Sequence, residues 1–206
     1  MRTGGATDID LSAKPTLQGR SVRLRPVEPG DVEVFVRILA EPEVRWLTGS
    51  SPGVDPDEDD AEDPEVLRRW YLSRNGTSDR LDLVVVDLAT GRAVGEVVLN
   101  ELDRDNRSMN LRILLGADGR DRGLGAEAVQ MATAYALDDV GLHRVELEVY
   151  AFNPRARRAY EKAGFQLEGT RRDALRTRDG WVDVHVMSVL ATDPRPPAPR
   201  NLAESG

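Results

Sequence analysis

The sequence predicts one α/β domain, of the α+β kind, built on a mixed central sheet, and three observations support this fold class. Strand-like segments follow one another without a helix between them in residues 81–115, which predicts an antiparallel meander. A helical pattern over residues 124–139 then stands between two strand-like segments, as in a right-handed β-α-β crossover. Residues 165–190 hold two more strand patterns around a turn, which predicts a closing hairpin.

The elements before the meander are short. Residues 21–26 alternate apolar and basic side chains and therefore predict a strand. Asp31 is a suitable N-cap for a helix, and Asp63 followed by Pro64 predicts the start of a second helix, because proline is tolerated at the first helical position. The apolar face of the first of these helices consists of Val32, Phe35, Val36 and Leu39.

Turn residues separate the strands of the meander. The first two strands, residues 81–88 and 93–102, are joined by residues 89–91 (ATG). The third strand, residues 108–115, follows the polar cluster at residues 103–106 (DRDN). Short polar residues and glycine adopt the backbone conformations of tight turns, so these joints predict hairpins.

The crossover is marked by helix signals at both of its ends. The helix predicted for residues 124–139 stops before a glycine, and residues 143–150 alternate as the next strand. Asn153 before Pro154 then predicts a capped helix that runs through Lys162.

The two final strands are predicted at residues 165–171 and 181–190, which closes the domain. We expect residues 1–16 to form a flexible arm, residues 17–190 to form the domain, and the proline-rich residues 191–206 to form a disordered tail.

One segment accounts for the net charge of the 206-residue chain, which is −8 from 28 Lys and Arg against 36 Asp and Glu. Residues 55–65 hold eight carboxylates and no basic residue, so an acidic loop lies within an otherwise neutral domain. This balance argues against a nucleic-acid partner. The chain has no cysteine and only two histidines, which excludes disulfides, thiolate nucleophiles and His-rich metal sites, and we expect no metal.

The sequence shows no membrane signal. No segment approaches the roughly 18 apolar residues of a membrane span, and the first residues lack the apolar core of a signal peptide. We therefore expect a cytoplasmic protein that does not bind membranes.

The most informative segment is the loop that leads into the predicted helix at residues 124–139. Its glycines allow a ligand to approach the backbone, and the helix N-terminus presents unpaired N–H groups at the positive end of its dipole. Two arginines add full positive charges. This combination predicts an anion site for a diphosphate, formed by Arg120, Asp121, Arg122, Gly123, Leu124, Gly125 and Ala126.

A dinucleotide-binding interpretation of the same glycines is less consistent with the chain. Gly123, Gly125 and Ala128 match the G-x-G-x-x-A spacing, and Glu148 follows about 20 residues later, as a ribose-binding acid would. That motif, however, begins almost at the end of its strand and opens a series of β-α-β units. Here seven residues separate Leu115 from Gly123, and a meander precedes the loop.

Two segments resemble signatures of the GCN5-related N-acetyltransferase (GNAT) superfamily. Arg120-x-x-Gly123-x-Gly125 resembles the pyrophosphate loop of that family, and residues 153–165 (NPRARRAYEKAGF) resemble its second signature. The opening residues 17–26 (LQGRSVRLRP) resemble the branch that contains ribosomal-protein N-terminal acetyltransferases. The resemblance covers roughly residues 17–190.

The resemblance implies direct acetyl transfer from acetyl-CoA to a primary amine, such as a protein N-terminus or a small molecule, within a ternary complex. The backbone of Ile113, Leu114 and Leu115 would pair with the pantetheine arm of the cofactor. Tyr160 would be the general acid that protonates the departing thiolate, because a phenol and a thiol have comparable basicity. Asn153 would hold the cofactor or an ordered water, in addition to capping its helix.

The general base is not marked by a motif. Many relatives place a glutamate on the strand before the pyrophosphate loop, but residues 108–115 (SMNLRILL) contain none. Glu96, on the preceding strand, is the first candidate, and Glu101, Asp103 and His185 are alternatives. A non-catalytic acyl-CoA-binding regulatory module therefore stays open as a second function.

The acceptor side is expected in the first half of the chain. Trp46, in a predicted loop, Trp70 and Tyr71 are aromatic candidates for its lining. The acidic segment 55–65 is either a solvated loop or an attractor for a cationic amine. The arginines that follow Asn153, at positions 155, 157 and 158, are either solvated or near the phosphates of the cofactor, and relatives suggest a homodimer.

Overall fold

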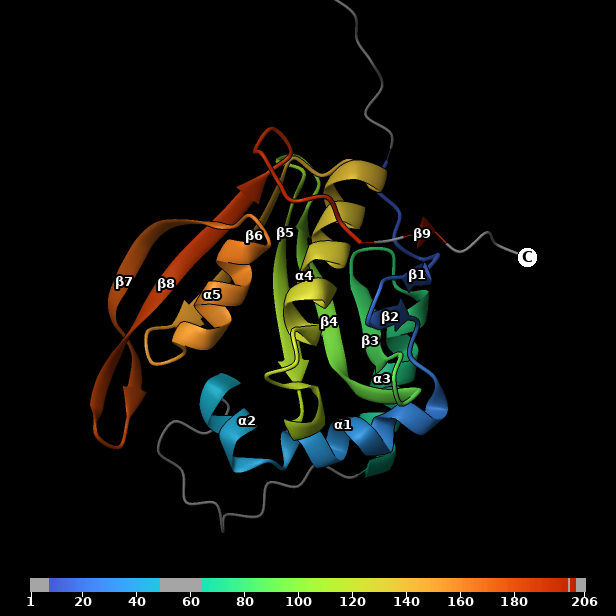
Figure 1. Cartoon of the computed structure of the whole chain (residues 1–206), viewed down its shortest axis with the longest axis horizontal. Helices are drawn as coiled ribbons and strands as arrows, with labels where there is room; N and C mark the ends of the chain where they lie inside the picture. The colour runs from blue at the N-terminus through green and yellow to red at the C-terminus, as the bar shows by residue number, and fades with distance from the viewer. Residues whose placement is uncertain (1–7, 49–63, 200, 203–206) are drawn as a thin grey trace, which may run out of the picture.

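The computed structural model of the chain describes residues 8–48, 64–199 and 201–202. Its centre is a nine-stranded mixed sheet with the order β7-β8-β6-β5-β4-β3-β2-β1-β9 (Figure 1). The strands are β1 (Leu17–Gln18), β2 (Val22–Arg25), β3 (Leu81–Asp87), β4 (Arg92–Asp103), β5 (Ser108–Leu115), β6 (Arg144–Tyr150), β7 (Gln166–Thr177), β8 (Gly180–Leu190) and β9 (Asn201–Leu202).

The predicted order of connections is confirmed. β3, β4 and β5 form the antiparallel meander, and β5 pairs in parallel with β6 after the crossover. β7 and β8 form the closing hairpin, whose second strand β8 returns to pair with β6. A sheet with one parallel pair and a preceding meander excludes the repeated β-α-β architecture of a dinucleotide-binding domain.

Helices cover both faces of the sheet. The helices α1 (Val32–Leu39) and α3 (Pro64–Ser73) cover one face, together with α2 (Pro42–Thr48), and the helices α4 (Leu124–Ala134) and α5 (Pro154–Lys162) cover the other (Figure 1). Three 3-10 segments connect these elements, Pro29–Asp31, Arg74–Gly76 and Ala117–Gly119, and a π-helical turn at Tyr135–Asp139 extends α4.

Successive side chains of β3 belong to two different cores, one on each face of the sheet. Leu81, Leu83 and Val85 belong to the core beneath α4, whereas Val84 and Val86 belong to the core formed with α1 and α3. Successive side chains of a strand point to opposite faces, so a strand that is apolar on both faces is buried on both sides.

Two segments differ from the sequence prediction. Trp46 lies on α2, where a loop was expected, because residues 42–48 are too few to show a helical period. The strand predicted to end at residue 171 continues to Thr177 as β7. Most of β7 is exposed on both faces, so its sequence lacks the apolar alternation that would have revealed it.

Parts of the predicted arm and tail are attached to the domain. Ile9 and Leu11 are buried in the main core, and the ammonium of Lys14 donates to three backbone carbonyls, those of Leu11, Thr77 and Arg80. Near the other end, β9 pairs with β1. Most of the acidic segment 55–65 lies outside the described residues. In the parts of the chain that the structure describes, no helix is long and apolar enough to cross a membrane.

Candidate active site

The site is built where β5 and β6 separate. The two strands pair only between Ser108–Asn110 and Arg144–Glu146, and beyond these residues they diverge. A cavity of about 920 Å³ opens in this gap and is lined from both faces of the sheet. Residues of α4 and α5 line it on one face, and residues of α2, α3, β3 and β4 line it on the other.

The exposed edge of β5 offers backbone hydrogen-bonding groups to this cavity. Gly116 donates its N–H to the carbonyl of Val94 on β4, and in an antiparallel ladder such pairs recur at every second residue. The backbone groups of Leu114 therefore face β4, whereas those of Ile113 and Leu115 face the gap. Only two of the three residues predicted to pair with the pantetheine arm thus present their backbone groups on the open side.

The predicted anion loop lies at one end of the gap and leads into α4. Gly123 adopts a left-handed conformation (φ 80°) immediately before the helix, which glycine accepts without strain. A Cβ atom on Gly125 would lie 2.8 Å from Cδ1 of Leu115, so glycine lets the helix start lie close to β5 without a shift of that side chain. Leu124 is buried and anchors the helix, and Gly125 and Ala126 line the cavity.

The arginines of the loop are already paired with carboxylates. Arg120 contacts Glu41 at 2.9 Å and Glu43 at 3.1 Å, and it also donates to the carbonyl of Leu115. Arg122 contacts the buried carboxylate of Asp87 at 2.9 Å. In the arrangement that the structure describes, carboxylates therefore compensate the positive charges of both arginines.

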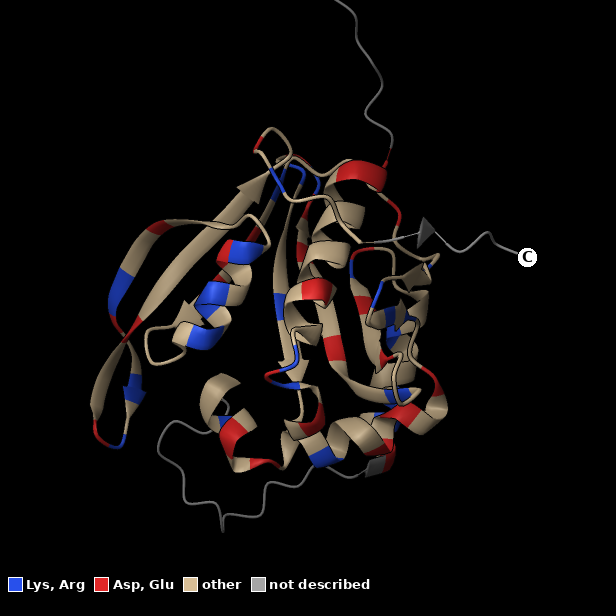
Figure 2. Ribbon diagram, in the orientation of Figure 1, with Lys and Arg blue, Asp and Glu red and all other residues tan. Residues whose placement is uncertain are grey.

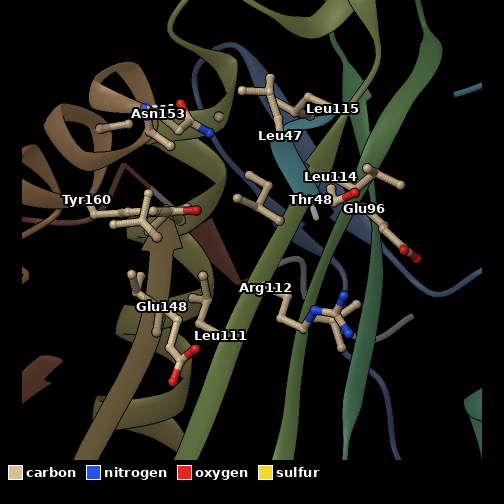
Figure 3. Close-up of a pocket in the computed structure, with 18 of the residues that line it drawn as sticks. Leu47, Thr48, Glu96, Leu111, Arg112, Leu114, Leu115, Glu148, Asn153 and Tyr160 are labelled. Carbon is tan, nitrogen blue, oxygen red and sulfur yellow. Dashed lines mark hydrogen bonds between the residues drawn. The ribbon is translucent and has the colours of Figure 1, made fainter. Parts of the chain in front are cut away.

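Tyr160 lies on α5, Asn153 caps the start of that helix, and both line the gap. Tyr160 is 7% exposed, and its hydroxyl points into the cavity (Figure 3). Burial raises the pKa of Tyr160 to about 12, so the phenol keeps its proton at neutral pH. The side chain of Asn153 accepts a hydrogen bond from the N–H of Ala156 at 3.0 Å, which confirms its role as the N-cap of α5.

Glu96 lies on the opposite side of β5 from Tyr160 and lines the same cavity (Figure 3). Its Oε1 lies 3.4 Å from the hydroxyl of Tyr71 on α3, and its Oε2 is buried with no hydrogen-bond partner among the residues that the structure describes. Burial, reinforced by the charge of Asp82, raises the pKa of Glu96 to about 7. A carboxyl with this pKa can accept a proton near neutral pH.

Residues 21–166 match the model of the acetyltransferase (GNAT) domain. The chain belongs to the GNAT family. It is therefore an N-acetyltransferase.

Relatives of this GNAT domain agree with the assignment. "Uncharacterized N-acetyltransferase p20" of Bacillus licheniformis is 27% identical over 175 residues, which covers 85% of this chain and 96% of that protein. "Putative ribosomal N-acetyltransferase YdaF" of Bacillus subtilis is 26% identical and covers 82% of this chain and 91% of that protein, in line with the branch that the opening residues resemble.

A solved structure shows the same fold. The spermidine N-acetyltransferase of Vibrio cholerae, crystallised in complex with CoA and spermine, superposes with a TM-score of 0.72. It shares 23% sequence identity and covers 84% of this chain and 97% of its own.

The other candidates for the general base have different surroundings from Glu96. Glu101 lines the cavity near the outer end of β4, and Asp103 accepts hydrogen bonds from Asn106 in the following turn. His185 lies on β8 with its Nδ1 3.0 Å from the hydroxyl of Thr170, and the described residues that line the cavity do not include it.

The sequence did not predict the residues that surround Glu96. Tyr71 was expected only as an aromatic lining residue, and no sequence pattern pointed to Asp82 or Arg112. Asp82 is buried and paired with Arg80 through two contacts of 2.7 Å, and Arg112 lines the cavity from β5. A signal that could have revealed this group is the position of Asp82, an acid among the apolar residues of a predicted strand. An unpaired charge is unfavourable there, so a nearby partner is expected.

The expected aromatic residues have different surroundings. Trp70 and Tyr71 line the cavity from α3, and Trp70 carries the guanidinium of Arg74 4.2 Å from its ring centre. Trp46 stacks on Phe152, at 4.6 Å between ring centres, beside the start of α5. The side chain of Trp46 thus connects α2 with the opposite wall of the gap.

Proposed function

We propose that this GNAT domain transfers an acetyl group from acetyl-CoA to a positively charged primary amine, directly and within a ternary complex. One observation carries the proposal: a single cavity passes through the sheet with Tyr160 on one side of β5 and Glu96 on the other. The proton donor and the proton acceptor therefore share one space and approach it from opposite faces.

The cofactor would lie along the edge of β5. The backbone groups of Ile113 and the N–H of Leu115 are available to the pantetheine amides, whereas the carbonyl of Leu115 already accepts from Arg120. The N-terminus of α4 faces the position of the diphosphate. The missing Cβ of Gly125 leaves the helix start close to β5, so the residues present fit an extended, anionic cofactor. Acetyl-CoA supplies the activated acetyl group.

The protein's own residues would move two protons. Glu96 would accept a proton from the ammonium form of the acceptor, through water in the cavity, so that the neutral amine can attack. Tyr160 would donate its phenolic proton to the sulfur as the carbon–sulfur bond breaks, so that CoA leaves as a thiol. The second proton that the nitrogen loses as the amide forms would return through water to Tyr160, and the one net proton of the reaction would stay on Glu96 until it is released to solvent.

A cationic acceptor fits the charges on the Glu96 side. Carboxylates of Glu96, Asp82 and Glu101 line this part of the cavity, opposed there by Arg80 and Arg112. The similar Vibrio cholerae structure, which carries spermine, supports a polyamine among the acceptors to be tested. A protein N-terminus and a small cationic amine stay within the same proposal, and the homodimer stays a prediction.

Two experiments test the function. Acetyl-CoA at 100 times its Kd should stabilise the protein by about 2.7 kcal/mol in a thermal scan. A thiol-release assay should then compare a polyamine, a peptide with a free N-terminus and a neutral amine, and we expect turnover to favour a cationic acceptor. Binding of acetyl-CoA without turnover of any amine in a broad panel would favour the acyl-CoA-binding module instead.

A further inference from the structure

The helix α2 is held across the cofactor end of the cavity by two sets of contacts. Glu43, at its start, contacts Arg120 of the loop at 3.1 Å and Arg155 of α5 at 3.2 Å. Trp46, one turn later, stacks on Phe152 at the opposite wall. Figure 2 shows the acidic start of α2 and the basic residues along α5.

The charges around the loop are balanced before any ligand binds. Arg120 is paired with Glu41 and Glu43, and Arg155 is paired with Glu43 and with Asp121 at 3.0 Å. A diphosphate is attracted to arginines only to the extent that their charge is not already compensated. A diphosphate that contacts Arg120 or Arg155 would therefore compete with one of these carboxylates.

Glu43 is the carboxylate that pairs with both Arg120 and Arg155. Glu41 also accepts the N–H of Ala117 at 3.1 Å, and only 27% of its side chain is exposed, so it fastens the end of α1 to the end of β5. Asp121 is more exposed, at 69% of its side chain, but it pairs with Arg155 and does not bridge the two arginines. Glu43 has 54% of its side chain exposed, and its carboxylate bridges Arg120 and Arg155 at the place where an anion between them would lie.

We propose that Glu43 is an internal competitor of the cofactor diphosphate, and that its displacement releases α2 from Arg120 and Arg155. The inference rests on the proposed binding of acetyl-CoA. Val44, Leu47 and Thr48 of α2 line the cavity. Replacement of Glu43 by the diphosphate therefore changes part of the wall that surrounds the amine acceptor. Cofactor binding then precedes productive binding of the amine.

The first test measures the affinity of acetyl-CoA for Glu43→Gln by titration calorimetry. Removing the competing charge should tighten the apparent Kd about five- to tenfold, the effect of two partly exposed ion pairs. Glu161→Gln is the matched control, because Glu161 forms a similar half-exposed pair with Arg157 at 2.9 Å on α5, and its Kd should stay within about twofold of wild type.

The outcomes separate this inference from the proposed function. If the wild type binds acetyl-CoA but Glu43→Gln binds it equally well or more weakly, the competitor role is wrong and the function stands. If neither variant binds acetyl-CoA, both the inference and the proposed function fail.

The second test follows α2 itself. In a Trp70→Phe, Trp181→Phe background, Trp46 is the remaining tryptophan. Acetyl-CoA should increase the acrylamide quenching of Trp46, and Glu43→Gln should show part of this increase without ligand. Quenching that is unchanged by the cofactor would show that α2 stays in place and would overturn the release of α2.

Discussion

The two halves of the cavity are built in different ways. The half on the α4 and α5 side is made from two continuous segments, the loop into α4 and the start of α5, together with the free edge of β5. The half on the other side brings together α2, α3, β3 and β4, which come from separate segments of the sequence. The first half can therefore be specified by short motifs, whereas the second exists only after the domain has folded.

The pKa values of the two candidate proton-transfer groups also depend on different numbers of residues. The pKa of Tyr160 is raised by burial alone, which keeps a weak acid protonated. The pKa of Glu96 is raised by burial and by a neighbouring carboxylate, against the hydrogen bond from Tyr71 and the charges of Arg112 and Arg80. The pKa of Glu96 depends on several neighbouring residues, so substitution of those residues should change it. Substitution of Tyr160 should instead remove a single proton donor.

The largest effect is expected from Glu96→Gln. Loss of the proton acceptor should lower kcat/KM for the amine by about 100-fold or more at pH 8, with little change in the Kd of acetyl-CoA. Steady-state kinetics and calorimetry measure the two quantities. Glu101→Gln is the control, because Glu101 lines the same half, and a larger loss in that variant would assign the base to Glu101 instead.

The same substitution should change how stability depends on pH. The pKa of Glu96 is about 7 in the folded state against 4.5 as the reference value, so the folded state holds the extra proton between these limits. The stability that Glu96 contributes is complete below pH 4.5 and is lost as the pH rises through 7, a change on the order of 3 kcal/mol. Urea unfolding from pH 5 to 8 should show wild type losing stability relative to Glu96→Gln, and parallel curves would contradict the raised pKa.

Tyr160→Phe should reduce kcat about 10- to 100-fold and leave the Kd of acetyl-CoA nearly unchanged, because only the proton for the thiolate is removed. The reduction should be smaller for an acyl donor with a more acidic thiol. Tyr150→Phe provides the comparison, since Tyr150 also lines the cavity and stacks on Phe152, and we expect it to stay within about threefold of wild type. Equal losses in both variants would indicate a packing role for Tyr160.

The contrast between the halves also explains what could be predicted from the sequence. Gly123, Asn153 and the crossover depend on local backbone requirements, so spacing alone places them correctly. The helix α2 is one of the elements missed, because the seven residues from Pro42 to Thr48 carry too little pattern. The pairing of Arg120 with Glu43 joins residues far apart in the chain, and a motif that counts arginines as free charge cannot detect it.

The smallest predicted effect tests the network around Glu96 most directly. Tyr71 donates to Glu96 over a long 3.4 Å contact, which lowers the pKa of that carboxyl, so Tyr71→Phe should move the acidic limb of the kcat/KM profile to higher pH by about half a unit. Activity should fall below pH 7 and stay unchanged at pH 9, while the substituted ring would keep the packing against Phe35. In a Glu96→Gln background the same substitution should leave the profile unmoved, because the group that Tyr71 tunes is gone. A shift that persists in the double variant would mean that Tyr71 acts on another titrating group.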